Sequence, residues 1–174
     1  MHYADIKKID IANGEGVRVS LFVSGCRHHC KGCFNEIAWN FKYGKEFTQD
    51  TVDEIIQDLN HDYVEGLSLL GGEPLEPENQ EALAELVTKV KDKYPNKNIW
   101  CYTGFDFEKD IMPECKTSAV TKQLISNIDV IVDGKFDESK MDRKLKFRGS
   151  SNQRIIDVKE TLHDNAIKMV KFTD

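Results

Sequence analysis

Long apolar runs are absent from the sequence, and no stretch approaches the roughly 20 apolar residues that a membrane-spanning helix needs. The first residues, MHYADIKK, lack the apolar core of a secretory signal, so we expect neither export nor a membrane anchor. An excess of positive charge is missing as well. The formal net charge of −6 gives no overall basic footprint for nucleic acid. Internal repeats and low-complexity linkers are also lacking, and the length predicts one domain over residues 1–174.

Cysteine is scarce and unevenly placed. The chain has five cysteines, of which Cys26, Cys30 and Cys33 lie close together while Cys101 and Cys115 stand alone. An odd number of cysteines, three of which are clustered, argues against the disulfide framework of a secreted protein. We therefore expect the chain in a reducing cytoplasm, with Cys101 packed in the interior and Cys115 as a reduced thiol.

The three clustered cysteines are the main candidates for a metal centre, and residues 24–35 are called the cysteine loop below. Their CxxxCxxC spacing lets the thiolates surround one centre but disfavours disulfides between them. A structural zinc ion or a fully ligated iron–sulfur cluster takes four protein ligands. Three cysteines would leave the fourth iron of a 4Fe-4S cluster open to a small molecule. The alternative is a zinc site with one further ligand, drawn from His28, His29 and Cys101.

The two histidines between the cluster cysteines have several possible roles. His28 and His29 could tune a redox potential or relay a proton, although loop histidines more commonly face the solvent. We therefore expect both rings at the surface.

Apolar segments and helical periodicity alternate along the chain. Strands are predicted at 3–11, 17–23, 66–70, 98–103, 128–132, 154–158 and 166–170. Helices are predicted from Thr48 or Asp50, from Pro77, and within 106–127, with Thr51 and Glu54 as an alternative capping box for the first. Segment 137–152 is expected to be a long loop.

This alternation predicts an α/β domain with a mostly parallel sheet. Too few strand–helix units exist to close an eightfold barrel, so the sheet should be open or a partial (β/α) barrel. The cysteine loop directly follows the strand predicted at 17–23. That position lies beyond the carboxyl end of a strand, where ligands bind in α/β folds.

Residues 71–74, with the sequence GGEP, follow the strand predicted at 66–70. Gly71 and Gly72 would let the backbone approach a ligand closely, and Glu73 could accept a hydrogen bond from an ammonium group. The alternative is a plain glycine turn that leads through Pro74 into the next helix.

The cysteine loop and the GGEP segment together resemble the radical S-adenosylmethionine enzymes. In those enzymes S-adenosylmethionine occupies the open iron, and a GGEP-type strand end contacts its amino group. Further strings are similar to the activating proteins of anaerobic ribonucleotide reductase, and the similarity covers essentially the whole chain. These strings are NGEGVR (13–18), GCFN (32–35), WCYTG (100–104), VDGKF (132–136) and RGSSNQR (148–154).

The resemblance implies an activase that reductively cleaves S-adenosylmethionine at a 4Fe-4S cluster and generates a glycyl radical on the catalytic subunit of the reductase. Cys26, Cys30 and Cys33 would hold the cluster. A flavodoxin- or ferredoxin-like protein would supply the electron.

The resemblance also implies contacts to S-adenosylmethionine. The methionyl end would meet Gly71, Gly72 and Glu73, and the adenine would meet the backbone of Gly32, Cys33 and Phe34. Most members of the superfamily carry an aromatic residue before the third cysteine, whereas here Gly32 precedes it and Phe34 follows, which makes Phe34 the candidate for stacking on the adenine. Weaker candidates for ribose or carboxylate contacts are Thr103, Asp133 and Lys135. A structural ion pair is the alternative role for Asp133 and Lys135.

Two other functions stay open at the level of sequence. One is a different radical S-adenosylmethionine enzyme, either the activase of another glycyl-radical enzyme or a small-molecule synthase. The other is a non-enzymatic zinc-binding interaction module, which would leave the GGEP segment unexplained. Segment 135–154 carries seven Lys and Arg residues against three acids. We expect the reductase to dock on this basic segment, although a solvated loop has the same composition.

Overall fold

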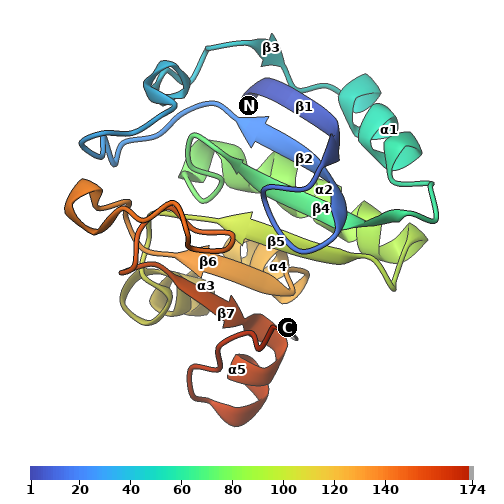
Figure 1. Ribbon diagram of the computed structural model, residues 1–174. Helices are drawn as coiled ribbons and strands as arrows, with labels where there is room; N and C mark the ends of the chain where they lie inside the picture. Colours follow the sequence, from blue (N-terminus) through green and yellow to red (C-terminus); the bar gives the residue numbers. More distant parts are fainter. Residues whose placement is uncertain (173–174) are drawn as a thin grey trace.

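A computed structural model describes residues 1–172, so residues 173–174 of the predicted domain lie outside it. Within residues 1–172 the chain forms a seven-stranded sheet in the order β3-β1-β2-β4-β5-β6-β7 (Figure 1). The strands are β1 (His2–Asp10), β2 (Val17–Val23), β3 (Lys45–Glu46), β4 (Val64–Gly71), β5 (Asn98–Tyr102), β6 (Val130–Asp133) and β7 (Arg154–Asp157).

The sheet is mixed, with a parallel centre and antiparallel edges. Strands β2, β4, β5 and β6 are neighbours and run parallel. Strands β1 and β3 on one side and β7 on the other pair antiparallel. The two edge strands, β3 and β7, lie at opposite ends of the order, so the sheet is open. The predicted α/β fold is confirmed, whereas the partial barrel is not.

Helix α1 (Gln49–Asp58) has Thr48 as its N-cap, which confirms one of the two predicted starts. The Thr48 N–H donates to the Thr51 hydroxyl over 3.1 Å. The alternative capping box of Thr51 and Glu54 is wrong, because Thr51 already lies inside the first turn. Helix α2 (Pro77–Lys93) begins at Pro77 as predicted.

The segment predicted to be helical at 106–127 divides into three pieces. These are η2 (Phe107–Ile111), α3 (Met112–Thr117) and α4 (Ala119–Ser126). Pro113 lies in the first turn of α3, and Ser118 ends α3 and caps α4, because its side chain accepts a hydrogen bond from the Thr121 N–H. No helix within residues 1–172 is both long enough and apolar enough to cross a membrane.

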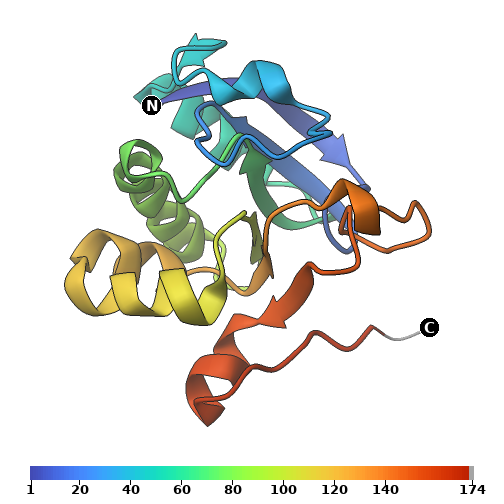
Figure 2. The same cartoon turned by 90° about the vertical axis from the view of Figure 1, so that its left-hand side faces the viewer.

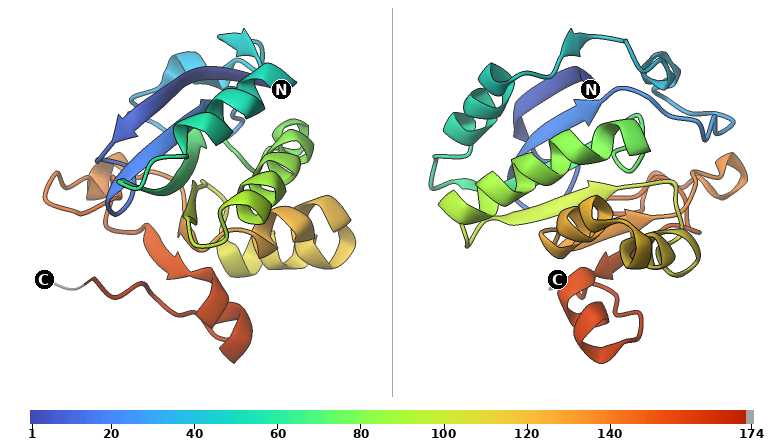
Figure 3. Two further views of the ribbon diagram at one scale, coloured as in Figure 1. Left: turned by 90° about the vertical axis from the view of Figure 1, so that its right-hand side faces the viewer. Right: turned by 180° about the vertical axis from the view of Figure 1, so that it is seen from behind.

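Helices α2 and α4 cover one face of the sheet, as the view from behind in Figure 3 shows. The main core lies between them and the sheet, and Ile99 and Cys101 of β5 belong to it. The buried position of Cys101 is therefore as predicted. The other face carries Trp100 and Val132, against which Phe147 packs. In Figure 2 helices α2 and α4 lie on one side of the sheet, and the 134–153 loop lies on the other.

The C-terminal part departs from the prediction. Strand β7 ends at Asp157, whose side chain accepts a hydrogen bond from the Glu160 N–H over 2.9 Å and caps an unpredicted helix, α5 (Val158–Asp164). The strand predicted at 166–170 is wrong, since only one bridge, between Met169 and Ile156, forms there. Two short helices, η1 (Glu36–Trp39) and η3 (Glu138–Lys140), complete the described chain, and η3 interrupts the loop predicted at 137–152.

Candidate functional site

The candidate segments meet at one edge of the sheet, where four parallel strands end. The cysteine loop follows β2, the GGEP segment follows β4, Thr103 follows β5, and segment 134–135 follows β6. Carboxyl ends of neighbouring parallel strands lie together, and this edge is where α/β folds bind their ligands. The predicted place of the cysteine loop, beyond the end of β2, is confirmed.

Gly71 and Gly72 bring the end of β4 into close contact with the start of the cysteine loop. Gly71 has a φ of +112°, and a Cβ there would lie 2.6 Å from both the nitrogen and the oxygen of Val23. A Cβ on Gly72 would lie 2.6 Å from the oxygen of Gly25. The Gly72 N–H donates to the Val23 oxygen over 2.7 Å. The two glycines therefore allow two backbone segments to touch, and this contact seats the cysteine loop on β4.

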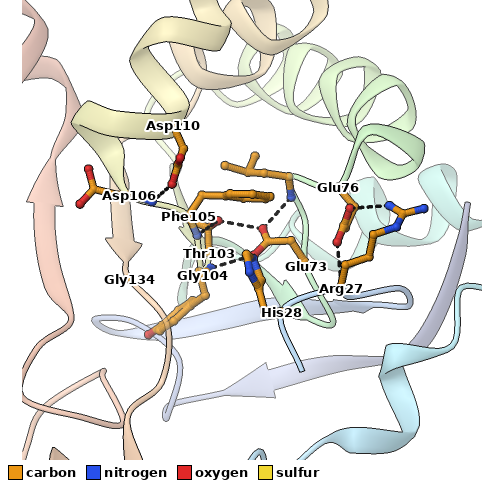
Figure 4. A network of polar contacts seen from close by, with 12 residues as sticks. Arg27, His28, Glu73, Glu76, Thr103, Gly104, Phe105, Asp106, Asp110 and Gly134 are labelled. Carbon is orange, nitrogen blue, oxygen red and sulfur yellow. Dashed lines mark hydrogen bonds and ion pairs between the residues drawn. The ribbon is translucent and has the colours of Figure 1, made fainter. Parts of the chain in front are cut away.

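Glu73 is 1% exposed, and its carboxylate is fully engaged by the chain itself (Figure 4). Oε1 accepts hydrogen bonds from the Leu75 N–H and the Thr103 hydroxyl, each over 2.8 Å. Oε2 accepts from the Gly104 N–H over 2.7 Å and lies 2.8 Å from Nε2 of His28. A carboxylate offers about four lone-pair positions. Glu73 thus joins the cysteine loop to the ends of β4 and β5.

His28 differs from the prediction of surface rings, whereas His29 agrees with it. The His28 side chain is 9% exposed and its ring packs edge-to-face with Phe105, with centroids 4.5 Å apart, so it does not face the solvent. His29 is exposed, but its ring stacks on Trp39 with centroids 4.3 Å apart. His29 has a φ of +48°, a left-handed conformation that turns the loop between Cys26 and Cys30.

Arg27 makes a second connection between the cysteine loop and the segment after β4 (Figure 4). Its N–H donates to Oε1 of Glu76 over 2.8 Å, and its Nη1 donates to Oε2 of Glu76 over 2.7 Å. The guanidinium also pairs with Glu78 and lies 4.4 Å from the ring centre of Phe41. The hydrogen bond from Arg27 lowers the pKa of Glu78 to about 2. No sequence pattern indicates these pairs, because 49 residues separate Arg27 from Glu76.

The cysteines of the loop are free thiols. Cys26 is buried, and burial raises the pKa of its thiol to about 11. Burial also raises the pKa of the Cys30 thiol. The Cys33 sulfur accepts a hydrogen bond from the Asn35 N–H over 3.4 Å. The loop therefore presents three reduced sulfurs, with Cys26 the most buried of them.

Three cysteine thiols on one loop are the type of donor that iron–sulfur clusters take. Within residues 1–172, no three His, Cys, Asp or Glu side chains converge closely enough to hold one metal ion. Each candidate for a fourth zinc ligand is engaged elsewhere: His28 with Glu73, His29 with Trp39, and Cys101 with the core. A 4Fe-4S cluster binds cysteine thiolates at its separate irons, so its ligands need not meet at one point.

Three other predicted residues lie at the same edge of the sheet. Thr103 is buried, and its hydroxyl is committed to Glu73. Asp133 is 2% exposed and forms an ion pair, although with Arg154 rather than Lys135: its two oxygens accept from Nε over 3.0 Å and from Nη2 over 2.6 Å. Lys135 is exposed. Their contacts to a cofactor stay predictions.

The outer part of the cysteine loop faces the solvent and the 134–153 loop. Phe34 is 90% exposed, so its ring is free to contact a ligand. Gly32 has a φ of +76°, and a Cβ there would lie 2.9 Å from the carboxyl group of Glu138. The proximity of Glu138 was not predicted, since Gly32 and Glu138 are 106 positions apart and no sequence pattern pairs them.

Known proteins are similar in sequence to this chain over most of its length. Residues 12–156 match the family model described as a 4Fe-4S single cluster domain, which defines the class of protein. A protein of Enterobacteria phage T4 is 43% identical, with 89% of this chain and 93% of the relative aligned. Relatives from Pasteurella multocida (89% and 96%) and Escherichia coli strain K12 (88% and 96%) are each 41% identical.

All three relatives carry the name anaerobic ribonucleoside-triphosphate reductase-activating protein. At this identity and coverage, the chain belongs to the family of these activating proteins. The resemblance predicted from the cysteine loop, the GGEP segment and the further strings is thereby confirmed.

Proposed function

We propose that this chain activates an anaerobic ribonucleotide reductase by generating a glycyl radical on its catalytic subunit. The observation that carries the proposal is a loop of three free cysteines seated on a GGEP strand end, in a chain of the activating-protein family. When bound, a 4Fe-4S cluster and S-adenosylmethionine supply the reductive cleavage and the radical that abstracts hydrogen from a glycine α-carbon.

Cys26, Cys30 and Cys33 would hold the cluster as thiolates. Because burial raises the pKa of Cys26 to about 11, its proton must leave when iron binds, and loading should release protons. Arg27 and His28 hold the first half of the loop through Glu76 and Glu73. The chain's own contacts therefore orient part of the loop.

S-adenosylmethionine would lie along the same edge of the sheet. Gly71, Gly72 and Glu73 would take its methionyl end, with an ammonium group replacing or sharing one of the hydrogen bonds that Glu73 now accepts. The exposed ring of Phe34 and the adjoining backbone of Gly32 and Cys33 would take the adenine.

Contacts to the ribose or the carboxylate would come from the end of β6. Lys135 is exposed and positively charged there, whereas Asp133 is held by Arg154. Thr103 would act through Glu73, to which its hydroxyl donates.

The partners follow from this chemistry. The catalytic subunit of the reductase would present its glycine to the edge of the sheet, with the basic segment 135–154 as the docking surface. A flavodoxin- or ferredoxin-like protein would deliver the electron. Five free cysteines suit a reducing cytoplasm, where we place the chain.

The test is anaerobic reconstitution with iron and sulfide, followed by reduction with S-adenosylmethionine present. We expect about four irons per chain and release of 5′-deoxyadenosine, both lost in Cys30→Ala. The matched control is Cys115→Ala, on α3 outside the loop, which should keep both. One tightly bound zinc ion with no cleavage would instead support a zinc-binding module.

A further inference from the structure

The carboxylate of Glu73 is saturated with hydrogen bonds (Figure 4). Oε1 accepts from the Leu75 N–H and the Thr103 hydroxyl. Oε2 accepts from the Gly104 N–H and lies 2.8 Å from Nε2 of His28. These four contacts match the roughly four lone-pair positions of a carboxylate. An incoming ammonium group can therefore bind Glu73 only where one of the four donors leaves.

Three of the four donors are fixed by the chain. The N–H groups of Leu75 and Gly104 belong to the backbone and cannot turn away alone. Leu75 is 3% exposed, and its oxygen accepts from Nε2 of Gln80 over 2.7 Å. The Thr103 hydroxyl also accepts from the Phe105 N–H over 3.1 Å, so turning it away would break two hydrogen bonds. These three donors therefore stay on the carboxylate.

His28 is the fourth donor, and its side chain can leave without unseating the cysteine loop. The Glu73 N–H donates to the oxygen of Gly25 over 2.8 Å, and Nη1 of Arg27 donates to Glu76 over 2.7 Å. Both contacts hold the loop independently of the His28 ring. In the described part of the chain this ring makes a single hydrogen bond, the one to Glu73. Turning the ring away therefore costs that one bond.

The His28 ring also fills a space beside the carboxylate. A Cβ on Gly104 would lie 2.6 Å from Cδ2 and 2.7 Å from Nε2 of His28. Gly104 does not have a positive φ, so its backbone conformation does not require glycine. The missing side chain instead makes room next to Glu73, and Phe105 borders this room, with its ring centroid 4.5 Å from that of His28. A ligand can enter the same room once the ring turns out of it.

We propose that His28 holds the place of the S-adenosylmethionine ammonium group on Oε2 of Glu73 and turns away when that group binds. This rests on the proposed function, in which Glu73 takes the methionyl end. An ammonium group carries three N–H donors, so it replaces the lost hydrogen bond and places a positive charge beside the carboxylate. Thr103 and Gly104 keep the carboxylate in place during the exchange.

The experiment compares two His28 variants with a matched control. His28→Leu removes the donor, whereas His28→Gln keeps an N–H that can reach Glu73. The control is His29→Asn, which changes the neighbouring histidine, stacked on Trp39, and Asn tolerates its φ of +48°. One measurement is amide hydrogen exchange of the iron-free protein. The other is the dissociation constant of the reconstituted, unreduced protein for S-adenosylmethionine and for its analogue without the amino group.

We expect the Leu75 and Gly104 amides to keep their protection in His28→Leu, because Glu73 still accepts from both. S-adenosylmethionine should bind His28→Leu about two- to tenfold more tightly than the wild type, since no hydrogen bond has to be broken first. The analogue should bind both equally. His28→Gln and His29→Asn should match the wild type. If His28→Leu does not fold by circular dichroism, His28→Ala carries both measurements.

Loss of amide protection in a folded His28 variant would overturn the proposal, because the ring would then be needed to hold the carboxylate. Weaker binding of S-adenosylmethionine, or an equal gain for the analogue, would overturn it as well. A protein that cleaves S-adenosylmethionine but binds it equally in wild type and His28→Leu would refute this inference alone. A protein that binds no cluster or no S-adenosylmethionine would refute the proposed function and the inference with it.

Discussion

The Nε2 atom of His28 lies 2.8 Å from Oε2 of Glu73, and this contact joins the middle of the cysteine loop to the GGEP segment. The two residues are 45 positions apart in the chain. Glu73 also binds Thr103 and Gly104, so three segments that follow β2, β4 and β5 share one carboxylate. The geometry of a cofactor site would depend on such a junction, because it sets the distance between the loop and the strand ends.

Glu73→Gln should lower the free energy of unfolding of the iron-free protein by about 1–3 kcal/mol. An amide nitrogen placed at either oxygen position would face a backbone N–H, of Leu75 or of Gly104, and leave that donor without its acceptor. Urea unfolding would measure the change. The control is Glu85→Gln on α2, where the side chain is exposed. Equal stability of the two variants would show that the hydrogen bonds of Glu73 contribute nothing to the free energy of unfolding.

Arg27 should couple more strongly to Glu76 than to Glu78. Glu76 is 3% exposed and accepts from Arg27 over 2.7 Å, whereas the Glu78 side chain is 49% exposed and screened by solvent. Double-mutant cycles with alanine at each position, followed by urea unfolding near neutral pH, would give the two coupling energies. A coupling to Glu78 as large as that to Glu76 would contradict this order.

Tyr102→Phe should stabilise the protein. The Tyr102 hydroxyl is buried without a hydrogen-bond partner among residues 1–172, so removing it should raise the free energy of unfolding by about 1 kcal/mol near pH 7.5. Tyr63→Phe, at a site that is 55% exposed, is the control and should change little. A less stable Tyr102→Phe variant would mean that the hydroxyl has a partner in solution.

The same residue predicts a dependence on alkaline pH. Burial raises the pKa of Tyr102 above its ordinary value of 10.0. Above that value the unfolded tyrosine ionises while the folded one stays protonated, so wild-type stability falls as the pH rises. The advantage of Tyr102→Phe should therefore grow between about pH 10 and pH 11. An advantage that does not change over this range would contradict the raised pKa.

Charge reversal in the basic segment should weaken binding to the reductase. Lys144→Glu combined with Lys146→Glu changes two exposed side chains of the 134–153 loop. We expect a larger dissociation constant by sedimentation or calorimetry, and a weaker dependence of binding on salt. The control is Lys89→Glu combined with Lys93→Glu on α2, which faces away from that loop (Figure 2). Wild-type affinity in the first variant would rule out this docking surface.

Much of the fold could be predicted because most of its strands and helices show a pattern in their own residues. The apolar runs of β2, β4 and β5 and the Pro77 start of α2 are local features. The C-terminal prediction failed for the same reason. Segment 166–170 has the composition of a strand but forms a single isolated bridge to β7, between Met169 and Ile156, flanked by the backbone hydrogen bonds of Lys168 and Val170. Helix α5 depends on a cap from Asp157, which lies within the strand predicted at 154–158.

The site could be predicted only in part. The cysteine loop and the GGEP segment are each a short continuous stretch of sequence, so both could be predicted. The partners that orient them could not: Arg27 meets Glu76, His28 meets Glu73, and Asp133 meets Arg154 across long stretches of chain. The charges of these residues and their separation along the chain do not reveal such pairs, because it is the topology of the sheet that brings them together.

The most direct test of the central proposal is electron paramagnetic resonance of the complete system. The reconstituted protein, the catalytic subunit of an anaerobic ribonucleotide reductase, S-adenosylmethionine and a reductant are mixed without oxygen and frozen. We expect a glycyl radical signal on the reductase with the wild type and with Cys115→Ala, and none with Cys30→Ala. Release of 5′-deoxyadenosine without any glycyl radical on the reductase would contradict the proposed activation.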